Sequence, residues 1–121
     1  LGIITVLFRS DEMLEDFFRS FSNQTFKDFR FYLIDNSYTT ETADQIRFLC
    51  AKYDFKDYEH INAMGNIGVA AGNNLGIACA SRDNCEYLLF CNNDIVFYES
   101  DLLSVLISDV DSMSIATPPG P

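Results

Sequence analysis

Residues 87–94, with the sequence Tyr-Leu-Leu-Phe-Cys-Asn-Asn-Asp, constrain the fold more than any other stretch of the chain. Five apolar residues run without interruption into two amides and a carboxylate. A short apolar run of this kind is typical of a strand covered on both faces, as in parallel sheets. Asn92, Asn93 and Asp94 would then lie just past the carboxyl end of the strand, where open α/β sheets bind ligands. One carboxylate beside amide oxygens suits a hard divalent cation.

The remainder of the chain alternates between strand-like and helix-like patterns. Four segments predict strands, and they are residues 3–8, 29–34, 58–61 and 87–91. The first and the last are apolar runs typical of buried strands. Two shorter segments predict further strands at residues 95–98 and 113–117. Such alternation predicts an α/β fold with a mainly parallel sheet. The chain ends just after the last predicted strand without a closing helix, so we expect it to be a truncated piece of a longer fold.

Helices are predicted between these strands. The first follows Ser10 and places an apolar stripe from Met13 to Phe21 in the core. The second begins at Thr39 or Thr40, and its inner face is expected to consist of Ala43, Ile46, Cys50 and Tyr53. The third is the glycine-rich stretch of residues 65–78, which is plausible as a helix if it packs closely on a sheet or a ligand. The last is capped by Ser100 and Asp101, and its apolar face consists of Leu102, Leu103, Leu106, Ile107 and Val110.

Composition excludes several classes of function. The formal net charge is −10, with 18 acidic and 8 basic residues, which argues against nucleic acid or an anionic membrane surface as the main partner. No apolar run approaches the ~20 residues that cross a bilayer, and no signal peptide is recognisable. The four cysteines form no CxxC pair and there is a single histidine, so a zinc site is not expected. Mostly apolar surroundings predict reduced thiols and a cytoplasmic protein.

Three predicted strands change from apolar to polar at their carboxyl ends, at Phe8-Arg9, Asp35-Asn36 and Asn92–Asp94. In a parallel sheet these ends share one edge, so two carboxylates and an aromatic ring could face one cleft. The glycine-rich stretch begins at the same edge, and its backbone N–H groups could hold phosphates without basic side chains. The residues alone therefore indicate an α/β domain for a phosphate-bearing ligand.

Each of these features also has a plain structural interpretation. A single acid such as Asp35 after a strand is usually a turn or cap residue, and Asn92–Asp94 alone is more often a polar turn than a metal site. Gly65, Gly68 and Gly72 form GxxGxxxG and not the dinucleotide-binding fingerprint GxGxxG. Phe8 on its own would be a core residue. The joint occurrence of these features at successive strand ends is what favours a functional site.

Four segments in order resemble the nucleotide-binding part of family 2 glycosyltransferases, closest to their rhamnosyltransferase-like members. The segments are residues 5–10 (TVLFRS), 33–37 (LIDNS), 66–76 (NIGVAAGNNLG) and 88–96 (LLFCNNDIV). The resemblance implies a three-layer, Rossmann-like GT-A fold in which residues 1–121 form the nucleotide-sugar-binding part of the domain. The acceptor-binding half is then not present in the chain.

The resemblance also implies roles for individual residues. Leu7 and Phe8 match positions beside the nucleotide base, and Asp35 matches the acid that meets the uracil or ribose. The segment that passes the ribose and diphosphate is matched by Asn66, Gly68, Gly72 and Asn73. Asn92–Asp94 matches the DxD position, so that Asp94 would bind Mn²⁺ or Mg²⁺ and Asn92 would offer a carbonyl oxygen. Arg9, Asn73 and Asn92 depart from the common family pattern.

The reaction implied is an inverting transfer of a sugar from a UDP- or dTDP-linked donor to an acceptor hydroxyl. The acceptor would be a saccharide or a lipid-linked saccharide in bacterial polysaccharide synthesis, at the inner face of the membrane or free in the cytoplasm. The cation would neutralise the leaving diphosphate, and a carboxylate general base would deprotonate the acceptor. In the family that base lies beyond the position of Pro121, so the catalytic residues stay unknown and this chain alone is expected to be inactive.

Three alternatives stay open at this point. A nucleotidyltransferase uses a similar sheet and metal, although it normally has a glycine-rich basic loop after the first strand, where this chain has Arg9-Ser10-Asp11-Glu12. A non-catalytic module could bind a nucleotide sugar without transferring it. A structural α/β domain could use its polar strand ends only as turns.

Overall fold

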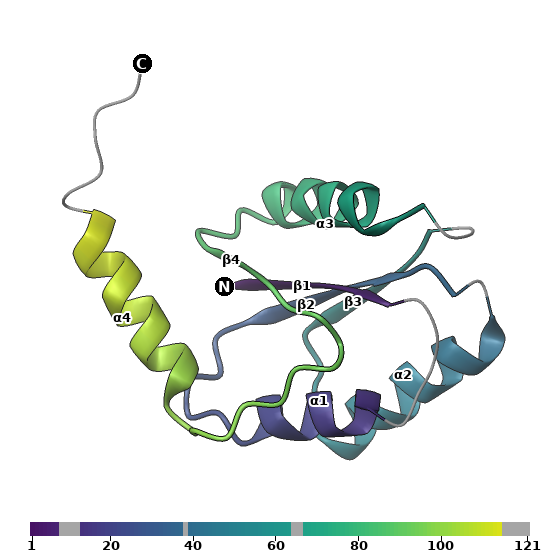
Figure 1. The fold of residues 1–121 in the computed structure, drawn as a ribbon, viewed down its shortest axis with the longest axis horizontal. Helices are drawn as coiled ribbons and strands as arrows, with labels where there is room; N and C mark the ends of the chain where they lie inside the picture. The colour runs from purple at the N-terminus through teal and green to yellow at the C-terminus, as the bar shows by residue number, and fades with distance from the viewer. Residues whose placement is uncertain (8–12, 38, 64–66, 115–121) are drawn as a thin grey trace.

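Four strands and four helices alternate along the chain in the computed structural model, which describes residues 1–7, 13–37, 39–63 and 67–114 (Figure 1). The strands are β1 (Gly2–Leu7), β2 (Arg30–Asp35), β3 (Tyr58–Asn62) and β4 (Leu88–Phe90). The helices are α1 (Met13–Ser22), α2 (Thr40–Lys52), α3 (Val69–Arg82) and α4 (Leu102–Ser114). The four predicted strands of the α/β fold are therefore confirmed, and each end differs from the prediction by at most one residue.

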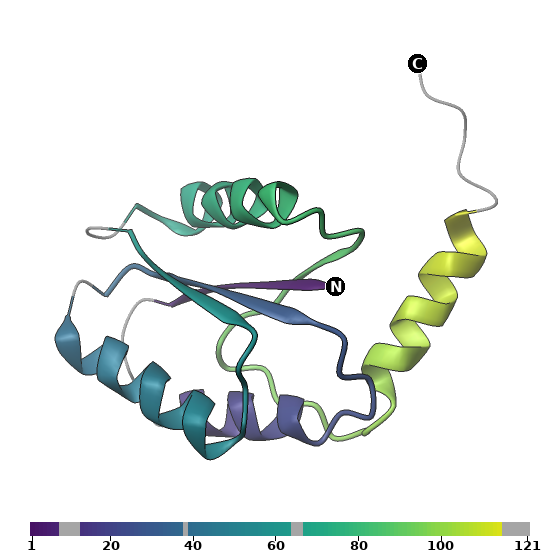
Figure 2. The same ribbon diagram turned by 180° about the vertical axis from the view of Figure 1, so that it is seen from behind.

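All strand pairs are parallel, and the sheet has the order β3-β2-β1-β4. The chain builds outward from β1 to β2 and β3, and then crosses to the other side of β1 to form β4. Helices α1 and α2 cover one face of the sheet, whereas α3 covers the other (Figures 1 and 2). This change of face is required because crossover connections are right-handed and the direction of strand addition reverses at β1. The result is the predicted three-layer arrangement.

The main core lies between the sheet and helices α1 and α2. Alternate residues of β1 and β2 point into it, among them Ile3, Leu7 and Phe31, and all three are fully buried. Helix α1 contributes four fully buried residues, Leu14, Phe17, Phe18 and Phe21. The rings of Phe21 and Phe31 meet edge to face with centroids 5.1 Å apart, a favourable geometry for aromatic pairs.

Two details of the predicted helical faces are wrong. Met13 is 48% exposed, because it is the first residue of α1 and precedes the part of the helix that lies on the sheet. On α2 the buried residues are Thr42, Ile46, Leu49 and Cys50, so the face is turned slightly from the predicted one and Ala43 is only partly covered. Thr39 is the N-cap of α2, as one of the two predicted alternatives has it, and its side chain accepts a hydrogen bond from the Thr42 N–H.

Helix α3 lies on the opposite face of the sheet and meets it through small residues. Gly72, Gly76 and Ala80 are its buried residues. A Cβ atom at Gly72 would lie 2.9 Å from Cγ2 of Val6, and one at Gly76 would lie 2.5 Å from Cγ2 of Ile4. The close packing predicted for the glycine-rich stretch is therefore packing against β1.

The chain after β4 differs from the prediction. Residues 95–98 form no strand, because the neighbouring backbone bonds to the connection between α1 and β2 instead: the Thr25 N–H donates to the Ser100 carbonyl at 2.8 Å. Helix α4 extends to Ser114, so the strand predicted at 113–117 is wrong for its first two residues, and residues 115–117 lie outside the described part. Leu103 is buried, but Leu106 and Val110 are 38% and 39% exposed, so the predicted apolar face is only partly covered.

Two global predictions concern the membrane and the cysteines. Within the described ranges, no helix combines the length and the apolar character that a bilayer crossing requires. All four cysteines are free thiols, and Cys50 and Cys91 are buried. Burial raises the pKa of the Cys50 thiol to about 12, so this group stays protonated and unreactive at neutral pH.

Candidate functional site

The reversal of strand order at β1 determines where a ligand can bind. The chain leaves β1 toward β2 on one side and returns to β4 on the other, so the connections diverge at the carboxyl ends of β1 and β4. Open α/β sheets bind ligands at such a switch point. Asp35 is level with Leu7 at the end of β1, and Phe90 is paired with Ile4. Strands β2 and β4 are two strand spacings apart, about 10 Å, with β1 between them, and β4 ends three residues before the level of Asp35.

Asp35 ends β2 at this edge and is almost fully buried, with 1% of its surface exposed. Its Oδ1 accepts hydrogen bonds from the backbone N–H of Ser37 at 2.9 Å and from the Ser37 hydroxyl. Its Oδ2 lies 2.8 Å from Nε2 of His60. A buried carboxylate is costly unless donors surround it, and three donors do so here. The turn interpretation of Asp35 is thus correct for Oδ1, and Oδ2 is directed toward β3.

Asn36 follows and is 3% exposed. Its Nδ2 donates to the carbonyl of Gly68 at 3.4 Å, which connects the end of β2 to the start of α3. Its Oδ1 is buried without a hydrogen-bond partner among the described residues. Buried acceptors are rarely left unpaired, so this oxygen is a candidate acceptor for a ligand hydroxyl or N–H group at the edge.

Helix α3 begins at the same edge. Gly68 is its N-cap with φ of 84° and ψ of 167°, a conformation that glycine adopts readily, and it provides no side-chain cap. The first N–H groups of a helix lack partners within the helix, and an anion can accept from them. Asn73, one turn into the helix, is half-buried, whereas Gly72 packs against Val6 of the sheet. The diphosphate contacts predicted for Gly68, Gly72 and Asn73 stay predictions.

Beyond β4, the predicted metal-binding segment forms a tight turn. The Cys91 N–H still bonds to the carbonyl of Ile4 at 3.0 Å, and the Ile95 N–H then closes the turn on the carbonyl of Asn92 at 3.2 Å. Asn92 and Asp94 are exposed and Asn93 is half-buried. Burial raises the pKa of the adjacent Cys91 thiol to about 11, so this group is protonated at neutral pH.

The chemistry of this turn fits a hard cation only in part. Asp94 offers one charged oxygen and Asn92 offers an amide oxygen, both of the type that Mn²⁺ and Mg²⁺ accept. The described residues contain no group of three or more His, Cys, Asp or Glu side chains able to hold a metal. A cation at Asp94 would therefore take most of its ligands from water and from a bound diphosphate.

Several predicted site residues lie together in the structure, whereas Leu7 lies in the core. Asp35, Gly68 and the turn of Asn92–Asp94 lie at one edge, as the strand-end pattern predicts. Leu7 is fully buried among core residues, so its side chain stabilises the fold. Phe8 and Asn66 lie outside the described residues.

Two residues at this edge were missed by the sequence-based prediction. His60 could have been suspected as the single histidine of the chain, but its contact with Asp35 depends on the β2–β3 register, in which His60 pairs with Leu33. Asn36 stands next to the predicted Asp35, yet nothing in the sequence distinguishes a buried, unpaired amide oxygen from one that faces water.

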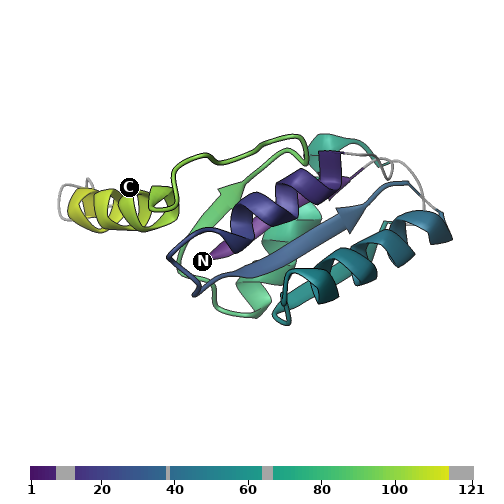
Figure 3. The same cartoon turned by 90° about the horizontal axis from the view of Figure 1, so that it is seen from below.

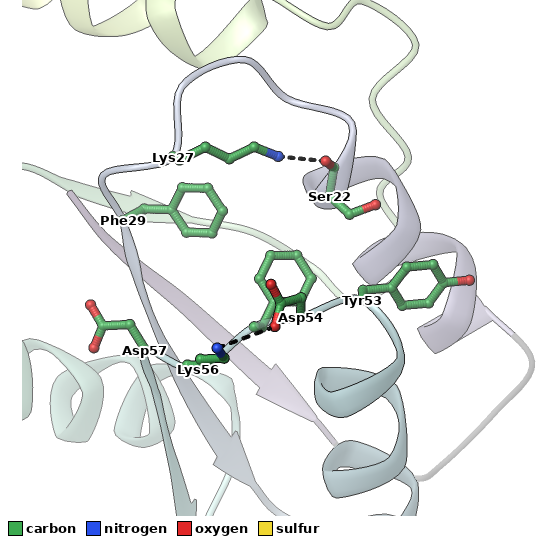
Figure 4. A pocket seen from close by; sticks show the side chains of 8 residues that line it. Ser22, Lys27, Phe29, Tyr53, Asp54, Lys56 and Asp57 are labelled. Carbon is green, nitrogen blue, oxygen red and sulfur yellow. Dashed lines mark hydrogen bonds and ion pairs between the residues drawn. The ribbon is translucent and has the colours of Figure 1, made fainter.

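A cavity of about 530 Å³ opens at the opposite edge, near the starts of β2 and β3 (Figure 4). Its polar groups are already paired: Lys27 donates to the Ser22 carbonyl, Lys56 lies 3.7 Å from Asp54, and Asp57 pairs with Arg30. This cavity shares no residue with the switch-point edge, and it contributes nothing to the candidate site.

Comparison with solved structures supports the assignment of the fold. S. aureus TarS, residues 1–349 in complex with UDP-GlcNAc, superposes with a TM-score of 0.73 at 18% identity, covering 93% of this chain and 31% of that one. The mannosyltransferase PcManGT of Pyrobaculum calidifontis, in complex with GDP-Man and Mn²⁺, gives a TM-score of 0.74 at 15% identity, covering 88% and 30%. Both are GT-A glycosyltransferases, and this chain spans about a third of their length.

A search of curated proteins by sequence found no match. The family model described as "Glycosyl transferase family 2" matches residues 2–113, nearly the whole of the chain. The parallel sheet and its switch point are consistent with this match. The chain belongs to glycosyl transferase family 2.

Proposed function

We propose that residues 1–121 form the nucleotide-sugar-binding part of a metal-dependent, inverting glycosyltransferase. The observation that supports this most strongly is the placement of Asp35 and of the Asn92–Asp94 turn on either side of β1 at the switch point. A carboxylate for the nucleoside and one for a metal–diphosphate complex are then separated by one strand. An extended nucleoside diphosphate laid across the end of β1 could reach both.

In this proposal each residue binds a different part of the donor. Asp35 accepts a hydrogen bond from the uracil or ribose, and Asn36 Oδ1 is a second acceptor beside it. The diphosphate passes the start of α3 at Gly68, where backbone N–H groups replace the basic side chains that this acidic chain lacks. Asp94 holds the cation, and Asn92 offers an amide oxygen or orients a water ligand.

A bound Mn²⁺ or Mg²⁺ would act as a Lewis acid that neutralises charge on the leaving diphosphate. The role of this chain is to bind and orient the donor so that the sugar faces the acceptor. This chain spans about a third of the length of these structural relatives. We propose that the general base and the acceptor site lie outside residues 1–121.

The structural relatives were solved with nucleotides of two different bases. TarS was solved with UDP-GlcNAc and UDP, and the mannosyltransferase with GDP-Man. We propose a UDP- or dTDP-linked donor and a saccharide or lipid-linked acceptor in polysaccharide synthesis. The four free cysteines support a cytoplasmic location, since a reducing compartment maintains thiols.

Calorimetric titration with UDP, dTDP and GDP, with and without Mn²⁺, tests the proposal. We expect binding of UDP or dTDP that strengthens when Mn²⁺ is present and loses this enhancement in Asp94→Ala. Asp109→Ala, which removes an exposed acid from α4, is the matched control and should bind like the parent protein. Metal-dependent binding that survives in Asp94→Ala would refute the assignment of the metal site.

A further inference from the structure

His60 occupies a special place because it is the chain's single histidine and it contacts the buried acid of the candidate site. It comes from β3, where it pairs with Leu33, and Asp35 pairs with Asn62 two residues further along. Residues two apart on a strand share a face, so His60 and Asp35 are diagonal neighbours on the same side of the sheet. The distance from Nε2 of His60 to Oδ2 of Asp35 is 2.8 Å, and 23% of the His60 side chain is exposed.

The hydrogen bonds of Asp35 differ between its two oxygens. Oδ1 accepts from the backbone N–H and the hydroxyl of Ser37, two residues further along, which forms a local Asx-type turn. Both acceptor positions of Oδ1 are therefore used within the turn. Among the described residues Oδ2 has one partner, His60, and a carboxylate oxygen can accept a second hydrogen bond. A ligand that meets Asp35 must use this remaining position on Oδ2.

The bond to His60 requires a form of the ring in which Nε2 carries a proton. An ionised carboxylate only accepts hydrogen bonds, so Nε2 carries the proton and donates it to Oδ2. The bond prevents the carboxylate from rotating about its own axis and determines the direction of the free position on Oδ2. If Ser37 were the only partner, the direction of this free position would depend on one side-chain torsion of Asp35.

We infer that His60 is a positioning residue for donor binding: through its Nε2–H it orients Oδ2 of Asp35 toward the nucleoside. The inference rests on the proposed nucleotide site and adds a residue to it. It distinguishes His60 from a structural histidine, because the effect of replacing it must pass through Asp35.

The test is a double-mutant cycle read by UDP affinity in the presence of Mn²⁺. His60→Leu removes the hydrogen-bond donor and replaces the ring with an apolar side chain of similar size. It should weaken UDP binding about tenfold, as expected for the loss of a hydrogen bond to a charged group. The same replacement in an Asp35→Ala background should change the affinity by about twofold or less, since the group that His60 orients is gone.

A conservative pair of variants provides the second readout. The side-chain nitrogen of Gln lies as many bonds from Cα as Nε2 of histidine, whereas that of Asn lies one bond closer. His60→Gln should therefore restore most of the affinity lost in His60→Leu, and His60→Asn should not. Thermal unfolding of each variant verifies that it is folded, and this comparison decides the matter if Asp35→Ala does not fold.

Three outcomes would overturn the inference. His60→Leu could bind UDP like the parent protein, or it could lose the same factor with and without Asp35, or Gln and Asn could behave alike. A parent protein that binds no nucleotide would refute the proposed function and this inference with it. The Asp35–His60 bond could then still be measured, because ¹⁵N spectra of a protein with one histidine report directly whether Nε2 carries the proton.

Discussion

Gly76 of α3 lies so close to Ile4 of β1 that a Cβ atom on the glycine would stand 2.5 Å from Cγ2 of the isoleucine. Two further atoms of Ile4 lie within 3.3 Å of the same point. Real Cβ atoms do not approach other carbons so closely, so a side chain at this position requires α3 or β1 to move. Because Asn36 bonds to Gly68 at the start of α3, the seating of this helix also determines the shape of the candidate site.

Gly76→Ala should lower the free energy of unfolding by about 1–2 kcal/mol. Overpacking in a tight core typically costs about 1–3 kcal/mol, and the higher helix propensity of alanine returns up to about 1 kcal/mol. Chemical denaturation of the parent and the variant measures the difference. Ile4→Ala should relieve part of this cost, so the double variant should be more stable than the sum of the two single effects predicts.

Asn74→Ala is the matched control because Asn74 is exposed on the same helix. It should leave the free energy of unfolding unchanged or raise it by up to about 0.5 kcal/mol, because alanine has the higher helix propensity. A loss of stability equal to that of Gly76→Ala would show that the packing against Ile4 is not the cause.

Gln24 joins the C-terminal segment to the domain. It is 1% exposed, its Nε2 donates to the Glu99 carbonyl at 2.6 Å, and its Oε1 accepts from the Leu103 N–H in the first turn of α4 at 3.0 Å. Gln24→Ala should destabilise the protein by about 2–3 kcal/mol, because two buried backbone groups lose their partners. Thermal or urea unfolding gives the loss.

Gln24→Glu is the informative companion variant. It keeps an oxygen for the Leu103 N–H but places a carboxylate against the Glu99 carbonyl, so only one of the two bonds can persist at neutral pH. A protonated carboxyl can donate to the Glu99 carbonyl again. The stability of Gln24→Glu should therefore lie between those of the parent and of Gln24→Ala at low pH. Equal stability of all three proteins would contradict the bridging role.

The layout of the fold could be predicted from sequence because it depends on local pattern. Apolar runs such as residues 29–34 and 87–91 identify strands wherever they pair, and the glycines of the third helix require a close neighbour whichever strand provides it. The segment after β4 could not be predicted in this way. Residues 95–98 have strand-like composition, but Gln24 and Thr25, some 75 positions earlier, occupy their neighbourhood.

The candidate site was predictable to the same extent. Asp35 and Asp94 follow strands that are visible in the sequence, so their shared edge follows from parallel pairing alone. His60 lies inside a strand, and its contact with Asp35 requires the register of β2 and β3 to be known to the residue. Register is determined by tertiary packing, and a single sequence does not show it.

Acid should weaken the protein through Asp83. Its carboxylate accepts from Arg82 and from the buried Tyr32 hydroxyl at 2.7 Å, and these bonds, that of Arg82 first, lower the pKa of Asp83 to about 2. An aspartate in an unfolded chain has a pKa of about 3.9, so the group stabilises the fold fully above that pH. The contribution decreases as the pH falls from about 4 to 2, when the folded protein also takes up the proton.

Asp83→Asn should therefore be less stable than the parent at pH 5 to 7, and the difference should disappear as the pH approaches 2. Urea denaturation across that range measures it. Tyr32→Phe removes one of the donors, so it should raise the pKa of Asp83 toward its ordinary value and flatten the same pH dependence. A difference between parent and Asp83→Asn that stays constant from pH 6 to pH 2 would contradict this explanation.

The turn after β4 allows a gain-of-affinity test of the proposed metal site. Asn92 and Asp94 are both exposed in a turn closed by the Ile95 N–H, so Asn92→Asp adds a second carboxylate without disturbing the core. A second charged oxygen near a divalent cation at the protein surface should tighten Mn²⁺-dependent UDP binding about three- to tenfold, since the Coulomb gain of roughly 1–2 kcal/mol is partly offset by desolvation. Asn74→Asp makes the same change of charge on the exposed side of α3 and should leave the affinity as it was. If both variants change the affinity alike, net charge is responsible, and the side chain at position 92 does not contact the cation.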